Sequence, residues 1–176
     1  MDLWQMIKTW FHAFKPSEIS PLSFKNSPEM SFRFAGEEDI KDLLSVERDV
    51  YEDIPWTASH FKSEIVTNRF STFIVAESSQ IIKGYIGLRW DRKFSNLHIS
   101  NFIVMKSWQH KGIGTQLFDY ALEFAKINGI GKMSLEVGRD NQEAQGFYRK
   151  RGFESIQILE SYYADGSDAV EMEKVL

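Results

Sequence analysis

Cysteine is absent from this chain, proline is scarce, and no apolar stretch is long. Without cysteine the protein has no disulfide bond, thiolate metal ligand or cysteine nucleophile, and a reducing compartment such as the cytoplasm fits this composition. No apolar run approaches the ~18 residues that a transmembrane helix needs. The first residues also lack the basic, apolar and small-residue regions of a signal peptide. We therefore expect a cytoplasmic protein without a transmembrane segment.

The charge balance is mildly acidic, with a formal net charge of -4 and an isoelectric point near 5.6. This balance argues against broad nucleic-acid binding, so no nucleic-acid partner is expected, and it is compatible with basic peptides or amines as substrates. Outside the first thirty residues there are three histidines, and no two of them have metal-ligand spacing, so no metal is expected. A chain of 176 residues that is 43% hydrophobic can form one domain with a sizeable core.

The first thirty residues differ from the rest of the chain. Apolar residues recur there at helical spacing, which predicts a short amphipathic helix: Leu3, Ile7, Trp10 and Phe14. Three prolines follow and predict a linker: Pro16, Pro21 and Pro28. We expect residues 1–30 to form this helix and linker, and residues 31–176 to form the main folded domain. The helix could dock on its own domain, on a second subunit as a homodimer, or on a membrane surface.

From residue 31 onward, apolar alternation and helical periodicity follow one another in a regular order. Strands are predicted over residues 31–35, 72–77, 82–90, 98–104, 132–137, 153–160 and 168–175. Helices are predicted over residues 40–50, from a cap at Thr57 to about Thr67, from Gly112 to Asn128, and from a cap at Asn141 to about Arg151. The order βααβββαβαββ predicts a mixed sheet with helices, in the α/β or α+β class.

The loop Gln109–Gly114 lies between a predicted strand and a predicted helix. A helix N-terminus offers unpaired N–H groups and a partial positive charge, which bind phosphate oxygens. The two glycines of the loop let a ligand approach the backbone closely, and Lys111 adds positive charge. The alternative interpretation is a tight turn before an ordinary helix.

This loop differs from two common nucleotide-binding motifs. A P-loop needs Gly-Lys-Ser/Thr, whereas Thr115 and Gln116 follow the second glycine here. A dinucleotide fingerprint needs a third small residue, where Leu117 stands, although Glu136 lies about where a ribose-binding acid would. The dinucleotide interpretation therefore stays open at this point.

Three residues after the glycine loop form a candidate catalytic group. Glu136 alternates with Leu135 and Val137, so its carboxylate points away from these apolar neighbours, to solvent or to a cleft. Tyr148 lies on the next predicted helix, which Asn141 can cap. Each residue also has a plainer interpretation. Glu136 could be a solvated strand carboxylate, Tyr148 an aromatic residue that anchors its helix, and Asn141 a plain N-cap.

The order of elements and these motifs together resemble the GNAT superfamily of acetyl-CoA-dependent N-acetyltransferases, over about residues 31–176. Gln109–Gly114 matches the pyrophosphate loop of that family, and Phe102-Ile103-Val104 matches the strand before it. The bacterial ribosomal-protein alanine N-acetyltransferases are the more similar subgroup. Three stretches carry that likeness: Pro55-Trp56; Leu135-Glu136-Val137 with Asn141, Ala144, Tyr148 and Gly152-Phe153; and Tyr162–Ala169 with Met172.

The resemblance implies a mixed, mostly antiparallel sheet of about seven strands flanked by helices. It implies direct transfer of an acetyl group from acetyl-CoA, without a metal, with Glu136 as general base and Tyr148 as general acid. The implied cofactor-binding residues are Phe102, Ile103, Val104, Gln109, His110, Lys111, Gly112, Ile113, Gly114, Thr115 and Asn141. The implied acceptor is a peptide or protein N-terminus, an alanine of a ribosomal protein in particular.

The chain departs from the family at Gln145-Gly146-Phe147 and Gly138-Arg139-Asp140, and His98 is a rival candidate for the base. The alternative functions are acetylation of a small amine (a polyamine, amino sugar or antibiotic) and a binding module that holds acetyl-CoA without turnover. Bulky Phe147 and Tyr148 are expected to favour acceptors that begin with a small residue.

Overall fold

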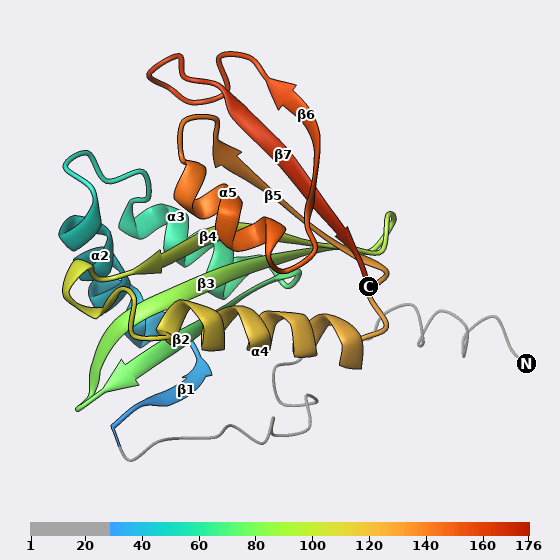
Figure 1. Cartoon of the computed structure of the whole chain (residues 1–176). Helices are drawn as coiled ribbons and strands as arrows, with labels where there is room; N and C mark the ends of the chain where they lie inside the picture. The colour runs from blue at the N-terminus through green and yellow to red at the C-terminus, as the bar shows by residue number, and fades with distance from the viewer. Residues whose placement is uncertain (1–28) are drawn as a thin grey trace, which may run out of the picture.

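A computed structural model describes residues 29–176, and the predicted N-terminal helix lies outside this range. One seven-stranded sheet has the order β1-β2-β3-β4-β5-β7-β6, in which only the β4–β5 pair is parallel (Figure 1). Its strands are β1 (Ser31–Phe34), β2 (Ser71–Ser78), β3 (Ile81–Asp91), β4 (Asn96–Val104), β5 (Lys132–Gly138), β6 (Glu154–Leu159) and β7 (Ala169–Val175). The predicted mixed sheet and its order of elements are confirmed.

The helices also follow the predicted order. They are α2 (Ile40–Val50), α3 (Ala58–Lys62), α4 (Ile113–Ile127) and α5 (Gln142–Arg149), with short turns η2 (Glu37–Asp39), η3 (Ser63–Thr67) and η4 (Lys106–Trp108). Thr57 and Asn141 cap α3 and α5 as predicted, because their side-chain oxygens accept hydrogen bonds from His60 N and Ala144 N. The predicted helix after Thr57 differs in one respect: its second half, η3, is a π-helical turn.

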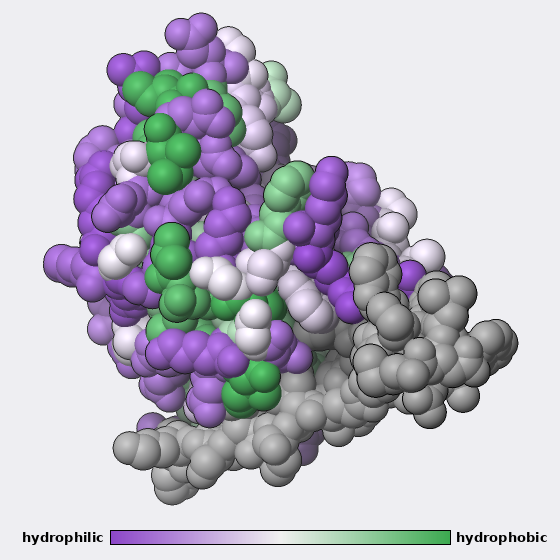
Figure 2. Space-filling model, turned by 90° about the vertical axis from the view of Figure 1, so that its right-hand side faces the viewer, coloured by the Kyte–Doolittle hydropathy of each residue, from purple (hydrophilic) through white to green (hydrophobic). Residues whose placement is uncertain are grey.

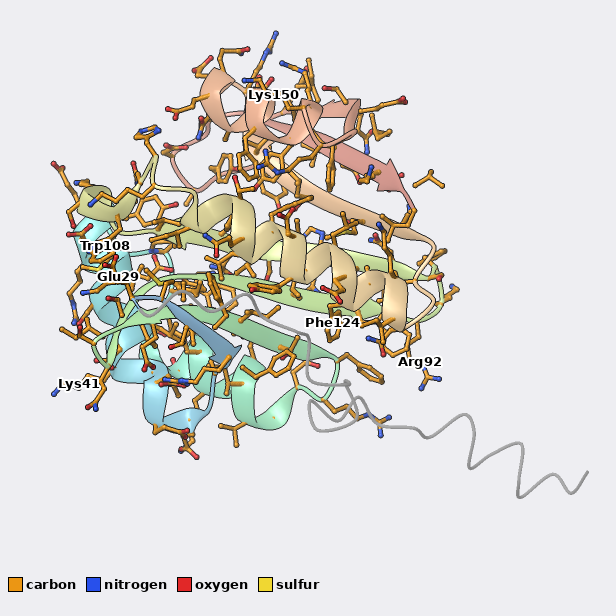
Figure 3. The ribbon with its side chains drawn as sticks, turned by 60° about the horizontal axis from the view of Figure 1, so that its bottom comes forward. Glu29, Lys41, Arg92, Trp108, Phe124 and Lys150 are labelled. Atoms are coloured by element: carbon orange, nitrogen blue, oxygen red, sulfur yellow. The ribbon has the colours of Figure 1, made fainter. Side chains whose placement is uncertain are left out.

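Two hydrophobic clusters cover the two faces of the sheet. α4 and α5 pack on one face through residues such as Leu117, Phe118 and Tyr148, and α2 and α3 pack on the other through Leu43 and Phe61. Figure 3 shows α4 lying across the sheet, with Phe124 on the helix fully buried. On the side shown in Figure 2, hydrophobic residues form small separate groups within a largely hydrophilic surface. No helix within residues 29–176 is long and apolar enough to cross a membrane.

The parallel pair β4–β5 separates after three positions. Asn96, Leu97 and His98 pair with Lys132, Met133 and Ser134, and no pairing continues beyond them. A bulge in β4 at Ser100 also shifts its register against β3. The C-terminal halves of β4 and β5 therefore diverge, and the residues that follow their pairing can face a shared opening.

Candidate active site

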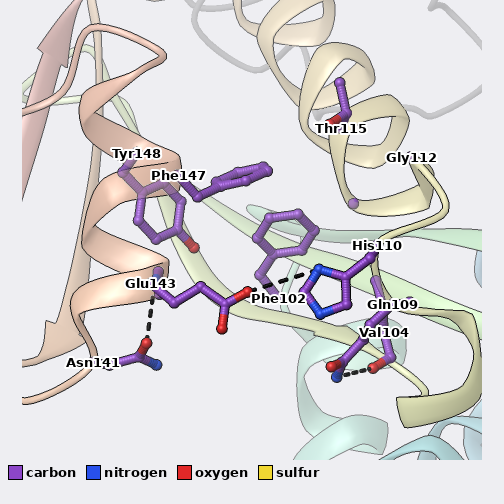
Figure 4. Close-up of a pocket in the computed structure, with 12 residues that line it drawn as sticks. Phe102, Val104, Gln109, His110, Gly112, Thr115, Asn141, Glu143, Phe147 and Tyr148 are labelled. Carbon is purple, nitrogen blue, oxygen red and sulfur yellow. Dashed lines mark hydrogen bonds and ion pairs between the residues drawn. The ribbon is translucent and has the colours of Figure 1, made fainter.

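A groove of about 650 Å³ lies between the end of β4, the start of α4 and the first turns of α5 (Figure 4). Its lining residues are Phe102, Val104, Gln109, His110, Gly112, Gly114, Thr115, Asn141, Glu143, Ala144, Phe147 and Tyr148. The structure thus brings most of the predicted cofactor-binding residues to one place, from the β4–α4 segment and from α5 further along the chain.

The loop before α4 presents its backbone N–H groups to this groove. His110 and Gly112 have left-handed backbone angles, with φ of 58° and 84°, and no side chain caps the helix. The first hydrogen bond of α4 runs from Gln116 N to Gly112 O, so the N–H groups of the intervening residues have no partner in the helix. Gln109 Nε2 donates to Val104 O at 2.9 Å and ties the loop to β4. This arrangement suits a ligand with several anionic oxygens, such as a pyrophosphate.

The side chains of three predicted cofactor-binding residues do not line the groove. Ile103 and Ile113 are 5% and 3% exposed and belong to the hydrophobic core. The Lys111 ammonium lies 4.8 Å from the centre of the Trp108 ring. At Ile103 and Ile113 a ligand in the groove could be contacted through main-chain atoms, whereas the Lys111 side chain is exposed, and the roles of these three residues stay predictions.

Glu143 is a groove residue that the sequence did not single out. Its Oε1 lies 3.9 Å from His110 Nδ1, so that α5 and the glycine loop approach each other across the groove (Figure 4). No local pattern distinguishes Glu143 from other exposed helix carboxylates. Phe147 also lines this groove and is absent from the lining of the second cavity, and its effect on the first residue of an acceptor stays a prediction.

A second cavity of about 350 Å³ adjoins the groove. The two share four lining residues: Phe102, Asn141, Ala144 and Tyr148. The remaining lining combines aromatic, aliphatic and polar residues with one carboxylate: Tyr51, Pro55, Trp56, Ile99, Ser100, Asn101, Ile103, Leu135, Glu136, Val137, Gly138, Tyr162 and Tyr163. The stretches Pro55-Trp56 and Tyr162-Tyr163, which are far apart in the sequence, therefore contribute to one cavity.

Glu136 supplies the carboxylate of this second cavity. Its Oε2 lies 3.3 Å from His98 Nε2 and accepts a hydrogen bond from the Tyr162 hydroxyl at 3.2 Å. Burial raises the pKa of Glu136, but the contacts with His98 and Tyr162 and the positive charge of Arg89 outweigh it, so the pKa lies below its ordinary value. The carboxylate is therefore ionised at neutral pH.

His98 and Glu136 are members of one hydrogen-bonded group and not separate sites. His98 Nδ1 lies 3.1 Å from Ser134 Oγ, which accepts a hydrogen bond from Asn96 Nδ2 at 2.7 Å. The pairing of His98 with Ser134 in the parallel strands places the imidazole beside Glu136, two residues further along β5. The two candidates for the base can thus act together.

Tyr148 lies at the junction of the groove and the cavity. It is 7% exposed, and its ring packs against Phe147 and Phe153 at centroid distances of 5.4 and 5.6 Å. Burial raises the pKa of Tyr148, so its hydroxyl keeps its proton at neutral pH and can donate a hydrogen bond.

Comparison with known proteins shows that this chain is similar to acetyltransferases. A family model described as an acetyltransferase (GNAT) domain matches residues 49–176, which include both cavities. A Bacillus subtilis protein provisionally named a [ribosomal protein bS18]-alanine N-acetyltransferase is 32% identical over 136 residues, covering 77% of this chain and 88% of that protein. An N-alpha-acetyltransferase of Sulfurisphaera tokodaii is 30% identical over 160 residues, covering 84% and 94%. The crystal structure of the paiA N-acetyltransferase of Thermoplasma acidophilum in complex with coenzyme A superimposes with a TM-score of 0.71 at 25% identity, covering 84% and 99%.

Proposed function

Because this chain belongs to the GNAT family of acetyltransferases, we propose that it transfers an acetyl group from acetyl-CoA to the N-terminal α-amine of a protein, with a ribosomal protein that begins with alanine as the preferred acceptor. That the enzyme is an acetyl-CoA-dependent N-acetyltransferase follows from the family and its relatives. The names of two relatives, which specify ribosomal protein bS18 alanine and an N-alpha amine, support the proposed acceptor.

The lining of the second cavity is the observation that carries the proposal. Among residues 29–176, Glu136 is the one carboxylate that lines it, and the other lining residues are uncharged. A polyamine carries several positive charges and would need several carboxylates, because an unpaired buried charge is costly. A peptide N-terminus brings one amine, and its first side chains can contact Pro55, Trp56 and the two tyrosines.

The groove offers backbone N–H groups and open space where the cofactor would bind. Acetyl-CoA supplies the thioester, and its pyrophosphate would face the N–H groups at the start of α4. Gly114 and Phe102 both line the groove. Gly114 has no Cβ, and an added one would lie 3.5 Å from the Phe102 ring. The pantetheine arm would then run between the diverging ends of β4 and β5, past Val104 and Asn141.

The proposed roles of the side chains follow from their protonation. Glu136, which is ionised, takes a proton from the acceptor ammonium, directly or through water, and His98 keeps the carboxylate oriented. The amine nitrogen then forms a bond to the thioester carbon while the carbon–sulfur bond breaks. Tyr148, which retains its proton, donates it or a hydrogen bond to the departing thiolate, and the second proton that the nitrogen loses as the amide forms restores Tyr148 or leaves to water. Each such role is worth roughly 10²–10⁴ in rate.

An α-amine suits this single base better than a lysine. Its ordinary pKa is about 8, against about 10.4 for a lysine side chain, so more of it is deprotonated near neutral pH. Tyr148, which lines both cavities, leaves limited room beside the reacting amine. This supports a small first residue, with alanine preferred.

Mass spectrometry of a peptide panel tests the proposal. The panel contains peptides beginning with alanine, serine or leucine, the same peptides with a blocked α-amine and an internal lysine, and spermidine. We expect the alanine peptide to be acetylated fastest and Glu136→Gln to abolish most of the product. Faster acetylation of spermidine or of lysine would replace the proposal by small-amine or lysine acetylation. Binding of acetyl-CoA with no product from any amine would indicate a binding module.

A further inference from the structure

Four polar side chains form a row across β4 and β5, and the last of them is the carboxylate of the second cavity. Asn96 and His98 alternate along β4, and Ser134 and Glu136 alternate along β5, so the members of each pair point to the same side of their strand. The parallel pairing of His98 with Ser134 brings the two pairs together. Ser134 is 4% exposed, and neither Ser134 nor His98 is among the residues that line the two cavities.

The Asn96 amide gives this row its direction. Its Nδ2 donates a hydrogen bond to Ser134 Oγ at 2.7 Å, and its buried Oδ1 has no partner among the described residues. The reverse orientation of the amide would place a nitrogen with two unpaired hydrogens in that buried position, which costs more than one unpaired oxygen. Ser134 Oγ is therefore an acceptor towards Asn96, and its own hydrogen is free to donate elsewhere.

The Ser134 hydroxyl has one further partner, the imidazole of His98. His98 Nδ1 lies 3.1 Å from Ser134 Oγ, and no other acceptor for this hydroxyl occurs among the described residues. If Nδ1 carried a hydrogen, Ser134 Oγ would accept from both neighbours, and its own hydrogen would be buried without a partner. Nδ1 is therefore the acceptor, and Ser134 donates to it.

The other ring nitrogen of His98 faces the carboxylate. Nε2 lies 3.3 Å from Glu136 Oε2, and an ionised carboxylate can only accept a hydrogen bond. An Nε2 lone pair at this distance would face a lone pair of the carboxylate oxygen. Because the partner of one ring nitrogen decides which nitrogen holds the hydrogen, Nε2 carries the single hydrogen of the neutral ring.

The charges around His98 were considered for a second proton on the ring. The charged and titratable groups near His98 and its two partners are Arg89 on β3, Lys132 and Glu136 on β5, Glu171 and Glu173 on β7, and Tyr162 in the loop before β7. Glu173 is bound to Lys132, and Arg89 pairs with His98 in the β3–β4 ladder. A second proton would be attracted by the carboxylates, but it would meet Arg89 and would lose the hydrogen bond from Ser134.

From this count of hydrogens we infer that Ser134 is a positioning residue of the enzyme: it holds His98 as the neutral Nε2–H tautomer, so that His98 presents a hydrogen to Glu136 and takes no proton from the acceptor amine. Asn96 fixes the direction of the Ser134 hydroxyl. The inference deepens the proposed function and rests on it, because it leaves Glu136 as the base that meets the amine.

Long-range ¹H–¹⁵N NMR spectroscopy of the free protein tests the tautomer. We expect the His98 signals, identified by their loss in His98→Gln, to show a protonated Nε2 and an unprotonated Nδ1 at neutral pH. A protonated Nδ1, with or without a hydrogen on Nε2, would overturn the inference. This measurement needs no acceptor, so it decides the tautomer even if the wild type acetylates no peptide and the proposed function fails.

Removal of the hydroxyl in Ser134→Ala tests the positioning role. Without its donor, Nδ1 can take up a proton beside the Glu136 carboxylate, so more of His98 should carry two ring hydrogens at neutral pH. This cation keeps Glu136 ionised to lower pH, so the acidic limb of the kcat/KM profile should move to lower pH. We expect kcat to fall about three- to tenfold, because a more stable carboxylate is a weaker base. Ser134→Thr, which keeps the hydroxyl, should restore both properties.

Two further variants separate this role from a structural one. Ser71→Ala is the matched control, because Ser71 is a buried serine of β2 outside both cavities whose hydroxyl has no partner among the described residues, and it should change neither kcat nor the profile. The profile of the double variant Ser134→Ala/His98→Gln should match that of His98→Gln alone, because Ser134 acts through His98. A fall in kcat with an unmoved limb, a limb at higher pH, or additive effects would overturn the inference. If Ser134→Ala does not fold, the tautomer of the wild type decides alone.

Discussion

Replacing Gly114 with aspartate tests whether the first turn of α4 holds the phosphates of the cofactor. Gly114 has helical backbone, and an added Cβ would meet the Phe102 ring at 3.5 Å, an ordinary van der Waals contact. An aspartate in the first turn of a helix also interacts favourably with the helix dipole. We therefore expect Gly114→Asp to fold, and any loss of affinity to report on the ligand.

The size of the loss follows from charge repulsion in the groove. Two unit charges 4–5 Å apart interact by roughly 3–4 kcal/mol at an effective dielectric constant of about 20. The groove is open to solvent, so screening should reduce this about two- to threefold. The remaining ~1–2 kcal/mol corresponds to a roughly 6- to 30-fold weaker binding of coenzyme A.

Isothermal calorimetry with coenzyme A measures this effect, and two variants control it. Gly114→Ala adds the Cβ without the charge and should bind within about twofold of the wild type, because the contact it makes is ordinary. Gly146→Asp adds the same charge on α5, where a Cβ meets nothing within 4 Å, and should leave binding unchanged. Unchanged affinity in folded Gly114→Asp would mean that the loop is only a turn. Tighter binding of NAD than of coenzyme A would restore the dinucleotide interpretation.

Three further results are expected. Glu136→Gln and Tyr148→Phe should each lower kcat by roughly 10²–10⁴ while the calorimetric Kd for coenzyme A stays within about twofold, and an equal loss in Kd would contradict the assigned roles. His98→Gln removes a contact that lowers the pKa of Glu136, so that pKa should rise and the acidic limb of the kcat/KM profile should move to higher pH; an unmoved limb would mean that His98 does not act on this carboxylate. Deleting residues 1–28 should leave coenzyme A affinity and thermal unfolding unchanged, and aggregation of the shortened protein would show that the segment covers a large apolar surface.

Features that depend on neighbours within a few residues could be predicted from the sequence. The caps at Thr57 and Asn141 each accept a hydrogen bond from a backbone N–H three residues ahead. The strands predicted over residues 72–77 and 82–90 leave a short turn between them, and the β2–β3 hairpin turns there at Ser79 and Gln80, which have left-handed backbone angles. The alternation of Glu136 with its apolar neighbours likewise gave its direction out of the core.

Side-chain directions around the groove could not be predicted from motif position alone. Ile103 and Ile113 belong to stretches that border the groove, but alternation along β4 and the helical turn of α4 point them into the core. Phe147 and Tyr148 are neighbours in the sequence, yet a helix turns successive side chains by about 100°. Phe147 therefore faces the cofactor groove alone, whereas Tyr148 reaches both cavities.

The long-range contacts of the site depend on sheet register, which the sequence does not reveal. His98 meets Glu136 because the two strands pair in parallel at His98 and Ser134 and then separate. The same short pairing has two consequences: it brings an imidazole beside the carboxylate and opens the space in which an amine and a thioester could meet. A longer β4–β5 ladder would close the opening, and an absent one would remove His98 from the carboxylate. Both the lowered pKa of Glu136 and the access of substrates to it therefore depend on the three residue pairs that join β4 and β5.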